Sequence, residues 1–319
     1  MSNNTSQPTI AVEGLQKKYG DNVVLDGVDL TVEGGSVFAL LGPNGAGKTT
    51  IVNILTTLIR ADGGSASVAG FDLGTEPAKV REQISVTGQF AAVDYVLTAR
   101  ENLVLIGQLR HVANPGETAA ELLDKFGLND AADRRLLTFS GGMRRRLDIA
   151  MSLVGNASVV FFDEPTAGLD PKGRADMWET IEGLAGGGTT VFLTTQYLEE
   201  ADRLADEIAI LHRGRIVAQG SPDELKTALP AGIVELEFVE QVQLAAVQKA
   251  LDGHHNVSRV DSKLVVATTG TVAEMADLFD MLRATGIEPT RFTKQTPTLD
   301  EVFFNILEEE MEDSYASSE

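Results

Sequence analysis

A glycine-rich segment, Gly42-Pro43-Asn44-Gly45-Ala46-Gly47-Lys48-Thr49, constrains the fold of this chain more than any other feature. It is a full match to the phosphate-binding pattern G-x-x-x-x-G-K-[ST]. Such a loop follows a buried strand, and residues 37–41 (Val-Phe-Ala-Leu-Leu) have that character. A helix should follow, and apolar residues recur at helical spacing over residues 49–60. The sequence therefore predicts a strand–loop–helix unit that binds the phosphates of a nucleotide.

Each residue type in this loop has a chemical reason to be there. Glycines let the backbone curl so that its N–H groups point at phosphate oxygens, and the helix N-terminus adds its dipole. Lys48 is expected to neutralise the β- and γ-phosphates, and the Thr49 hydroxyl to coordinate Mg²⁺. The nucleotide-binding residues predicted for this segment are Gly42, Pro43, Asn44, Gly45, Ala46, Gly47, Lys48, Thr49 and Thr50.

A second apolar strand, residues 159–163, ends in two carboxylates, Asp163 and Glu164. Asp163 stands where a carboxylate at a strand end reaches the Mg²⁺ shell. Glu164 points elsewhere, as adjacent strand residues do, and is predicted to be the general base that positions or deprotonates the attacking water. Polar residues often do no more than end a strand. The phosphate loop upstream makes the catalytic interpretation the stronger one.

The order of predicted elements indicates an α/β protein with a second, smaller domain. Residues 10–36 alternate like an antiparallel sheet, and residues 77–155 are mostly helical in pattern. Strands and helices then alternate, which is typical of a largely parallel sheet covered on both faces. After a boundary near 229–232 the pattern becomes β-α-β-β-α-β, the order of a ferredoxin-like unit.

We therefore predict three parts of the chain. Residues 8–228 form the nucleotide-binding domain, with a helical subdomain at about 77–155. Residues 232–307 form a C-terminal domain for regulation or dimerisation. Residues 308–319 form an acidic tail that is expected to be disordered.

Composition excludes some classes of function. The formal net charge is −21 and the pI near 4.5, so the surface repels phosphate backbones, and broad nucleic-acid binding is not expected. There is no cysteine, which excludes disulfides and cysteine-based metal sites. No apolar run approaches the roughly 18–20 residues that cross a bilayer. We expect the chain to be soluble by itself and to take any membrane role from a partner.

The segment Phe139-Ser140-Gly141-Gly142-Met143 lies between the phosphate loop and the carboxylate strand. In that position it resembles the signature loop of ATP-binding cassette (ABC) ATPases. Other short segments resemble motifs of the same family in the expected order. Thr166-Ala167-Gly168-Leu169-Asp170 resembles the D-loop, Gln89 the Q-loop glutamine, and Tyr19 the aromatic residue that stacks on adenine. The resemblance covers about residues 8–228.

This resemblance implies a P-loop ABC ATPase core that has an antiparallel β subdomain and a helical subdomain. It also implies a head-to-tail dimer in which the ATP bound by one copy is gripped by the other. The cofactors implied are ATP and Mg²⁺, with Thr49, Gln89 and Asp163 near the metal. The residues expected to act in trans are Ser140, Gly141, Gly142, Met143 and Asp170, and the expected catalytic residues are Lys48, Glu164 and Gln196.

Two positions depart from the usual family pattern. Met143 stands where the signature ends in glutamine, and Gln196 where the family commonly has a histidine that contacts the γ-phosphate. An amide can donate that hydrogen bond but cannot become cationic. Our hypothesis is that Gln196 is a phosphate sensor. Both departures resemble the daunorubicin-resistance (Drr-type) branch of exporters, as does Leu299-Asp300-Glu301-Val302-Phe303-Phe304 near the C-terminus. That last segment also reads as an ordinary amphipathic helix.

The function expected from the resemblance is that of the ATPase subunit of an ABC exporter of drugs or lipid-like compounds. It would lie at the cytoplasmic face of the cell membrane and drive two multi-spanning permease subunits, with a second copy of itself as partner. Two alternatives remain open at this stage. One is a soluble ABC ATPase that acts on ribosomes or DNA, which generally has two cassettes in one chain and basic surfaces. The other is an importer ATPase, whose C-terminal domain more often reads as a small β-barrel.

Overall fold

The computed structural model describes residues 8–87, 94–155, 157–228, 233–238, 241–260, 263–268, 271–295 and 298–303. The chain divides into two compact units, Met1–Ser221 and Pro222–Glu319, and each is described by itself. Among the described helices, none combines the length and the hydropathy that crossing a membrane requires.

The first unit is built on a six-stranded sheet in the order β10-β9-β3-β8-β7-β6. Its strands are β3 (Val37–Leu41), β6 (Ile84–Thr87), β7 (Val159–Asp163), β8 (Thr190–Thr195), β9 (Glu207–His212) and β10 (Arg215–Gly220). All neighbours pair in parallel except the β9–β10 hairpin. Every residue of β3, β7 and β8 is buried, as in strands covered on both faces. The predicted largely parallel sheet is confirmed.

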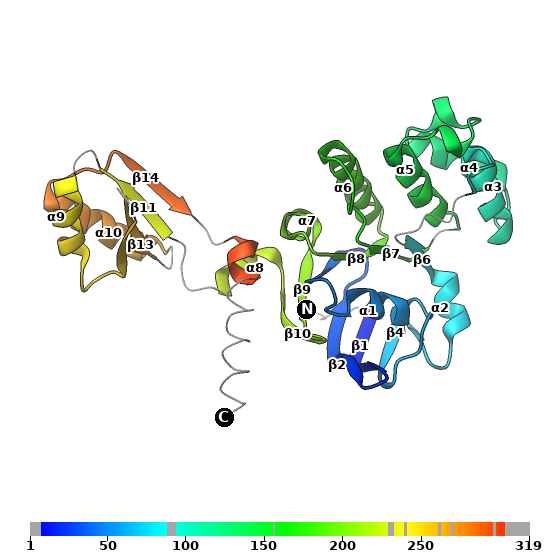
Figure 1. Ribbon diagram of the computed structural model, residues 1–319, viewed down its shortest axis with the longest axis horizontal. Coiled ribbons are helices and arrows are strands. Elements are labelled where there is room, and N and C mark those ends of the chain that lie inside the picture. The colour runs from blue at the N-terminus through cyan, green and yellow to red at the C-terminus, as the bar shows by residue number, and fades with distance from the viewer. Residues whose placement is uncertain are drawn as a thin grey trace, which may run out of the picture. The chain divides into compact units, whose positions relative to one another are not determined.

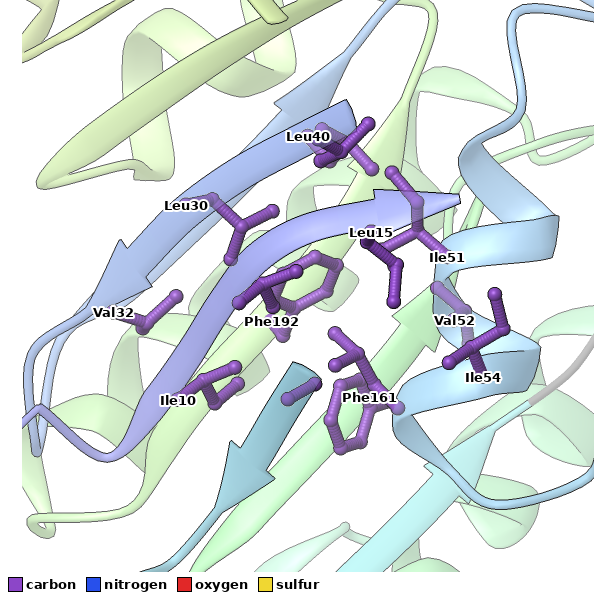
Figure 2. Packing of buried hydrophobic residues seen from close by; sticks show 14 of the residues in the cluster. Ile10, Leu15, Leu30, Val32, Leu40, Ile51, Val52, Ile54, Phe161 and Phe192 are labelled. Atoms are coloured by element: carbon purple, nitrogen blue, oxygen red, sulfur yellow. The ribbon is translucent and has the colours of Figure 1, made fainter. Parts of the chain in front are cut away.

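A second, antiparallel sheet has the order β2-β1-β4-β5. Its strands are β1 (Ile10–Tyr19), β2 (Asn22–Val32), β4 (Gly63–Val68) and β5 (Phe71–Asp72). The core between the sheets and the first helix joins Ile10, Leu15 and Leu30 to Phe161 and Phe192 (Figure 2). Burying one such side chain stabilises the fold by about 1.5–3 kcal/mol. This cluster therefore holds together the two sheets and the helix that flank the phosphate loop.

The described helices of the first unit are α1 (Lys48–Leu55), α2 (Pro77–Gln83), α3 (Ala99–Leu109), α4 (Pro115–Lys125), α5 (Gly141–Ser152), α6 (Pro171–Gly186) and α7 (Leu198–Leu204). Two 3₁₀ turns, η1 (Asn129–Ala131) and η2 (Leu136–Thr138), precede α5. Figure 1 shows α3, α4 and α5 grouped together, apart from β1, β2 and β4. A capping box opens α3, because Thr98 accepts from the N–H of Glu101 and the Glu101 carboxylate accepts from the N–H of Thr98.

Two details differ from the sequence-based expectation. The helix after the phosphate loop ends at Leu55 rather than near residue 60, because Thr57 takes a left-handed conformation with φ of 62°. Within residues 77–155, which read as mostly helical, β6 is a strand that pairs with β7 at the edge of the main sheet. Four residues are too few to show a periodicity.

The second unit contains α8 (Pro222–Ala228) and then β11 (Ile233–Glu237), α9 (Gln241–Leu251), β12 (Val257–Val260), β13 (Lys263–Ala267), α10 (Val272–Thr285) and β14 (Arg291–Gln295). This is the predicted β-α-β-β-α-β order, and the strands form one antiparallel sheet, β12-β13-β11-β14. Its core includes Val234, Leu236, Leu264 and Val266 from the sheet. Residues 299–303 are helical, with Leu299 and Val302 buried, and the rest of the predicted final helix and the acidic tail lie outside the described residues.

Candidate nucleotide site

The phosphate loop is held by close backbone packing between β3 and α1. Gly47 is the N-cap of α1 with φ of 113°, and a Cβ built on it would lie 2.8 Å from Cδ2 of Leu25 and 3.1 Å from the carbonyl oxygen of Val24. A Cβ on Gly42 would overlap the carbonyl oxygen of Leu211. Only glycine fits these two positions without a shift of the backbone around them. The loop conformation is therefore fixed by this chain's own packing.

Lys48 is only 5% exposed and turns back over the loop. Its Nζ donates to the carbonyl oxygen of Gly42 at 2.8 Å and to that of Pro43 at 3.2 Å. The same Nζ lies 3.4 Å from Oε1 of Glu164. The buried ammonium of Lys48 therefore faces both the carbonyl oxygens of the loop and a carboxylate. A bound γ-phosphate would replace these groups as the partner of the ammonium.

Asp163 is buried at the end of β7 and is oriented by two hydroxyls. Thr49 Oγ1 donates to its Oδ2 at 3.0 Å, and Thr194 Oγ1 donates to its Oδ1 at 2.6 Å. The parallel register of β7 with β8, which pairs Asp163 with Thr194, produces this arrangement. A threonine hydroxyl and a carboxylate from two elements thus converge as the sequence predicted.

Glu164 has a strained backbone, with φ of 50° in the left-handed region. Its N–H donates to the carbonyl oxygen and to Oγ1 of Thr194, both at 3.1 Å, which holds the residue in this conformation. Non-glycine residues in sparsely populated regions concentrate at functional sites and persist where their surroundings over-determine them. Here the strain turns the Glu164 carboxylate toward Lys48 rather than along the strand.

Tyr19 lies at the end of the β1–β2 hairpin and is 52% exposed. It pairs with Asn22, two residues before Val24, whose carbonyl oxygen lies against Gly47. The Nζ of Lys17 sits 5.5 Å from the centre of the Tyr19 ring. The Tyr19 ring is therefore accessible, and its stacking on adenine stays a prediction.

Gln196 follows β8 directly and is half-buried. Thr195 pairs with Leu41, and its carbonyl oxygen accepts from the N–H of Gly42 at 3.3 Å, so Gln196 emerges beside the start of the phosphate loop. Its side chain makes no hydrogen bond with the residues that the structure describes. The amide is thus not engaged by any described residue, and its role as a phosphate sensor stays a prediction.

The Ser140-Gly141-Gly142 turn has a different setting. Ser140 is exposed and is the N-cap of α5, where its Oγ accepts from the N–H of Met143 at 3.3 Å. This leaves the hydroxyl hydrogen of Ser140 for another acceptor. A Cβ built on Gly141 or on Gly142 would meet nothing within 4 Å among the described residues. Nothing in this chain's own packing therefore requires glycine at either position.

The remaining predicted residues are less completely placed. Asp170 is exposed and caps α6, accepting from the N–H of Gly173 at 2.8 Å. Gln89 lies outside the described residues. Of the predicted set, the structure brings together Lys48, Thr49, Asp163 and Glu164. No described contact joins residues 140–142 to the phosphate loop of the same chain.

Sequence reasoning missed two residues near this site. Thr194 orients both Asp163 and Glu164, and Glu200 on α7 is 1% exposed beneath Gln196. The only signal for Thr194 was its place at the end of a strand that parallels β7. For Glu200 there was none, because the adjacent Glu199 looks the same in sequence and is exposed.

The donor set fits a nucleotide with Mg²⁺. Magnesium binds through one or two protein oxygens, several waters and phosphate oxygens rather than in an all-protein cage. Thr49 and Asp163 supply two oxygens, and the described residues contain no cluster of three or more His, Cys, Asp or Glu side chains for a metal. Backbone N–H groups at the start of α1 and the Lys48 ammonium supply donors for phosphate.

Comparison with known proteins points to one family. Residues 25–167 match the family described as ABC transporter, and residues 220–306 match the family described as ATP-binding protein DrrA1-3-like, C-terminal domain. The chain is 44% identical to a daunorubicin resistance ATP-binding protein of Streptomyces coeruleorubidus over 93% of this chain and 94% of that one. It is 46% identical to a daunorubicin/doxorubicin resistance ATP-binding protein of Streptomyces peucetius over 93% and 92% of the two chains.

The fold is also that of solved structures. One described as the ATP-binding subunit of an ABC transporter superposes with a TM-score of 0.62 at 28% sequence identity, covering 69% of this chain and 92% of the other. The part of this chain that it leaves uncovered is about as long as the second unit.

Proposed function

The chain belongs to the ABC transporter ATP-binding proteins, in their daunorubicin-resistance (Drr) type, and from this premise we propose that it drives the export of drug-like or lipid-like compounds. It is an ATPase that, in this proposal, energises separate membrane subunits. One observation supports the proposal: Lys48 and Thr49 of the phosphate loop contact Glu164 and Asp163 at the end of β7, while the glycines of the signature turn have no described neighbour that would exclude a side chain.

The residues around the phosphate loop have distinct tasks in hydrolysis. Loop N–H groups and Lys48 hold the β- and γ-phosphates, and Thr49 and Asp163 hold Mg²⁺, which when bound neutralises developing phosphate charge. Glu164 accepts the proton of the attacking water, and its strained backbone aims the carboxylate into the site. Gln196 donates an amide hydrogen bond to the γ-phosphate. Tyr19 stacks on the adenine.

The second copy of the chain completes each site. Ser140 donates its free hydroxyl hydrogen, and the first N–H groups of α5 point at the γ-phosphate held by the partner. Gly141 and Gly142 leave room for that approach. Asp170, exposed at the start of α6, lies at the same dimer interface. Met143 stands where the family signature has glutamine, and this change leaves the backbone N–H donors of α5 in place.

A surface for the membrane subunits lies beside the signature helix. Arg144 donates to the carbonyl oxygen of Phe139 at 2.9 Å, and its guanidinium sits 5.7 Å from the centre of the Tyr95 ring. Exposed apolar side chains gather in this part of the sequence: Tyr95, Val96, Leu105 and Leu109. Gln89 is assigned a role in coupling by its resemblance to the Q-loop glutamine alone, since it lies outside the described residues. The chain would then lie peripherally on the cytoplasmic face of the membrane, and its second unit would support dimerisation or regulation.

The experiment first reads the open reading frames beside this gene for a multi-spanning membrane protein, and then co-expresses that protein with this chain and purifies from detergent. We expect the two proteins to co-purify and the daunorubicin-stimulated ATPase activity to vanish in a Glu164→Gln complex. For the isolated chain, activity should rise faster than linearly with protein concentration while dimers are scarce. Recovery of the chain with ribosomes instead of membranes would overturn the exporter assignment.

A further inference from the structure

A buried polar cluster lies in the first unit, away from the phosphate loop, and hydrolysis as described above does not use it. We call it the Glu200 cluster. It consists of Glu200 on α7, Trp178 and Arg174 on α6, Thr166 between β7 and α6, and Arg145 on α5 with its partner Asp148. Trp178 Nε1 donates to Glu200 Oε1 at 3.2 Å. Arg145 Nη1 lies 3.1 Å from Asp148 Oδ2.

The cluster joins α5, α6 and α7, the three helices that begin at or just after the signature turn, Asp170 and Gln196. Arg145 lies three residues after Gly142 on the signature helix. Glu200 lies in the first turn of α7, which begins two residues after Gln196, and the Thr195 hydroxyl just before Gln196 acts on the Glu200 carboxyl and accepts from the N–H of Tyr197 at 3.0 Å. Arg174 and Trp178 follow Asp170 on α6. A small cavity lined by Gly142 and Arg145 of α5 and by Leu169 and Gly173 before and on α6 shows that these two elements face each other.

The cluster contains two cationic and two anionic side chains, but some of its buried polar atoms have no hydrogen-bond partner among the described residues. Arg145 and Arg174 oppose Asp148 and Glu200. Burial raises the pKa of Glu200, while the hydroxyls of Thr195 and Thr166, the Trp178 indole and the charge of Arg174 oppose that rise. Burial likewise lowers the pKa of Arg145, against the charges of Asp148 and Glu200. The carboxylate is therefore held by several elements at once.

Three buried atoms of the cluster have no hydrogen-bond partner among the described residues: Thr166 Oγ1, Arg174 Nε and Glu200 Oε2. Thr166 lies near enough to affect the Glu200 carboxyl but makes no hydrogen bond of acceptable geometry with it. A buried polar network with unpaired atoms destabilises the conformation in which those atoms lack partners. A second conformation that supplies the missing hydrogen bonds is favoured by the same atoms. Arg145 and Asp148 move with α5, so movement of α5 relative to α6 and α7 would change the charge that Arg145 places near Glu200.

We propose that the Glu200 cluster is a positioning device that couples the signature helix α5 of a subunit to Gln196 of the same subunit. This inference rests on the proposed head-to-tail dimer. In that dimer, α5 of one subunit touches the nucleotide of the partner, whereas its Gln196 touches its own nucleotide. The cluster therefore connects the two composite ATP sites through the interior of each subunit, and the two sites do not hydrolyse independently.

Trp178 offers a direct readout, because it is the only tryptophan in the chain. It is 7% exposed, and the Arg203 guanidinium lies 4.8 Å from its ring centre. The background is Glu164→Gln, in which hydrolysis is slowed and an ATP-bound dimer accumulates, measured by light scattering. On addition of ATP and Mg²⁺ we expect the Trp178 emission to change over the same range of protein concentration as dimer formation. An unchanged emission in a dimer that forms would overturn the proposal.

The functional test compares Glu200→Gln with a matched surface control. Glu182 pairs with Arg203 at 3.3 Å and also joins α6 to α7, but both side chains are more than 40% exposed. We expect Glu200→Gln to lower kcat about five- to tenfold and to move the Hill coefficient for ATP toward one, with the midpoint of thermal unfolding retained. Glu182→Gln should change neither kinetic parameter. A wild-type Hill coefficient and kcat in Glu200→Gln would contradict the coupling.

A second variant protects the test against misfolding. Trp178→Phe keeps an aromatic ring but removes the donor to Glu200 together with part of the buried indole volume, and it should lower the Hill coefficient in the same direction. Normal cooperativity in a folded Trp178→Phe protein would count against the cluster. Failure of the proposed function has a different signature. In that case the Glu164→Gln chain itself would remain monomeric in ATP.

Discussion

Two glycine-containing turns in the first unit each lead into a helix N-terminus, but their glycines have opposite settings. In the phosphate loop, Gly42 and Gly47 are buried against Leu211, Leu25 and Val24, so the fold itself demands glycine. In the signature turn, Gly141 and Gly142 face open space. Ser140 already satisfies an N–H of α5, so the turn is complete as a helix cap.

The difference separates a requirement of folding from a requirement of assembly. Glycine in the first turns of a helix is less favourable than alanine, and nothing in this chain compensates for it at α5. This loss of helix stability is explained if a group from outside the chain must approach the backbone at Gly141 and Gly142. The phosphate loop is thus preorganised within one subunit, whereas the open signature turn is what the proposed dimer requires, in which it meets a nucleotide that another subunit holds.

The strongest test of this contrast is Gly142→Ala. We expect the ATPase rate to fall about 100-fold or more, because the new Cβ displaces phosphate from donors of α5, an effect comparable to losing one preorganised donor. Thermal stability should be unchanged or slightly higher, since alanine favours the helix. ATPase assays and calorimetry measure the two effects.

Gly183→Ala is the matched control for that variant. Gly183 lies in α6, and a Cβ there also meets nothing within 4 Å among the described residues. The change should raise stability by up to about 1 kcal/mol and leave turnover unchanged. Equal loss of activity in both variants would show that helix rigidity, rather than access to the turn, explains the result.

Gly47→Ala should behave in the opposite way. A side chain at φ of 113° that also contacts Leu25 and Val24 combines backbone strain with overpacking, and we expect a loss of about 2–4 kcal/mol in the free energy of unfolding. Gly45→Ala shares the positive φ but meets open space, so it should cost about 1–2 kcal/mol. Urea denaturation measures both. If Gly47→Ala were as stable as the wild type, the phosphate loop would not be the folding-determined turn.

Thr194→Val tests the support beneath the catalytic carboxylates. Valine keeps the shape but removes the donor to Asp163 and the acceptor for the N–H of Glu164. Loss of an outer-shell partner of this kind typically costs about 10- to 100-fold in metal affinity or activity, and we expect about tenfold, with a higher requirement for Mg²⁺. Titration of the ATPase rate with Mg²⁺ checks it. An unchanged Mg²⁺ dependence would assign Thr194 a structural role only.

The smallest expected effect concerns pH and the buried carboxyl near the signature helix. Burial raises the pKa of Glu200 above its ordinary value of 4.5, so the folded state holds that proton more tightly than the unfolded state. Its stabilising contribution is then complete below the unfolded pKa and is lost as pH rises through the folded pKa. We expect the unfolding midpoint of the wild type to decline relative to Glu200→Gln across that window. Parallel pH profiles would contradict the raised pKa.

Much of the architecture was predictable because it depends on local patterns. Residues 37–41 and 159–163 are continuous apolar runs, and the Gly-x-Gly-Lys-Thr sequence leaves few conformations for the loop between a strand and a helix. The β-α-β-β-α-β order of the second unit could likewise be predicted, because segments with the two-residue hydrophobic period of strands are distinct from segments with the 3.6-residue period of helices. The strand-end position of Asp163 followed from the same reasoning.

The features that sequence did not predict depend on tertiary contacts. The pairing of Thr194 with Asp163 follows from the register of two strands that are far apart in sequence. The burial of Glu200 rather than Glu199 depends on how α7 is rotated against α6, since consecutive helical residues differ by about 100°. The openness of Gly141 and Gly142 can be seen only when every neighbour is placed.

Association of two differently disabled subunits tests the central claim most directly. In a Glu164→Gln background, one protein carries Lys48→Ala and the other Gly142→Ala, and ATP-dependent dimerisation is followed by analytical ultracentrifugation. Neither protein should dimerise alone. Because a head-to-tail dimer pairs the loop of one subunit with the turn of the other, the mixture contains one intact composite site, and ATP should produce heterodimers. A mixture that stays monomeric at every ratio would contradict the account.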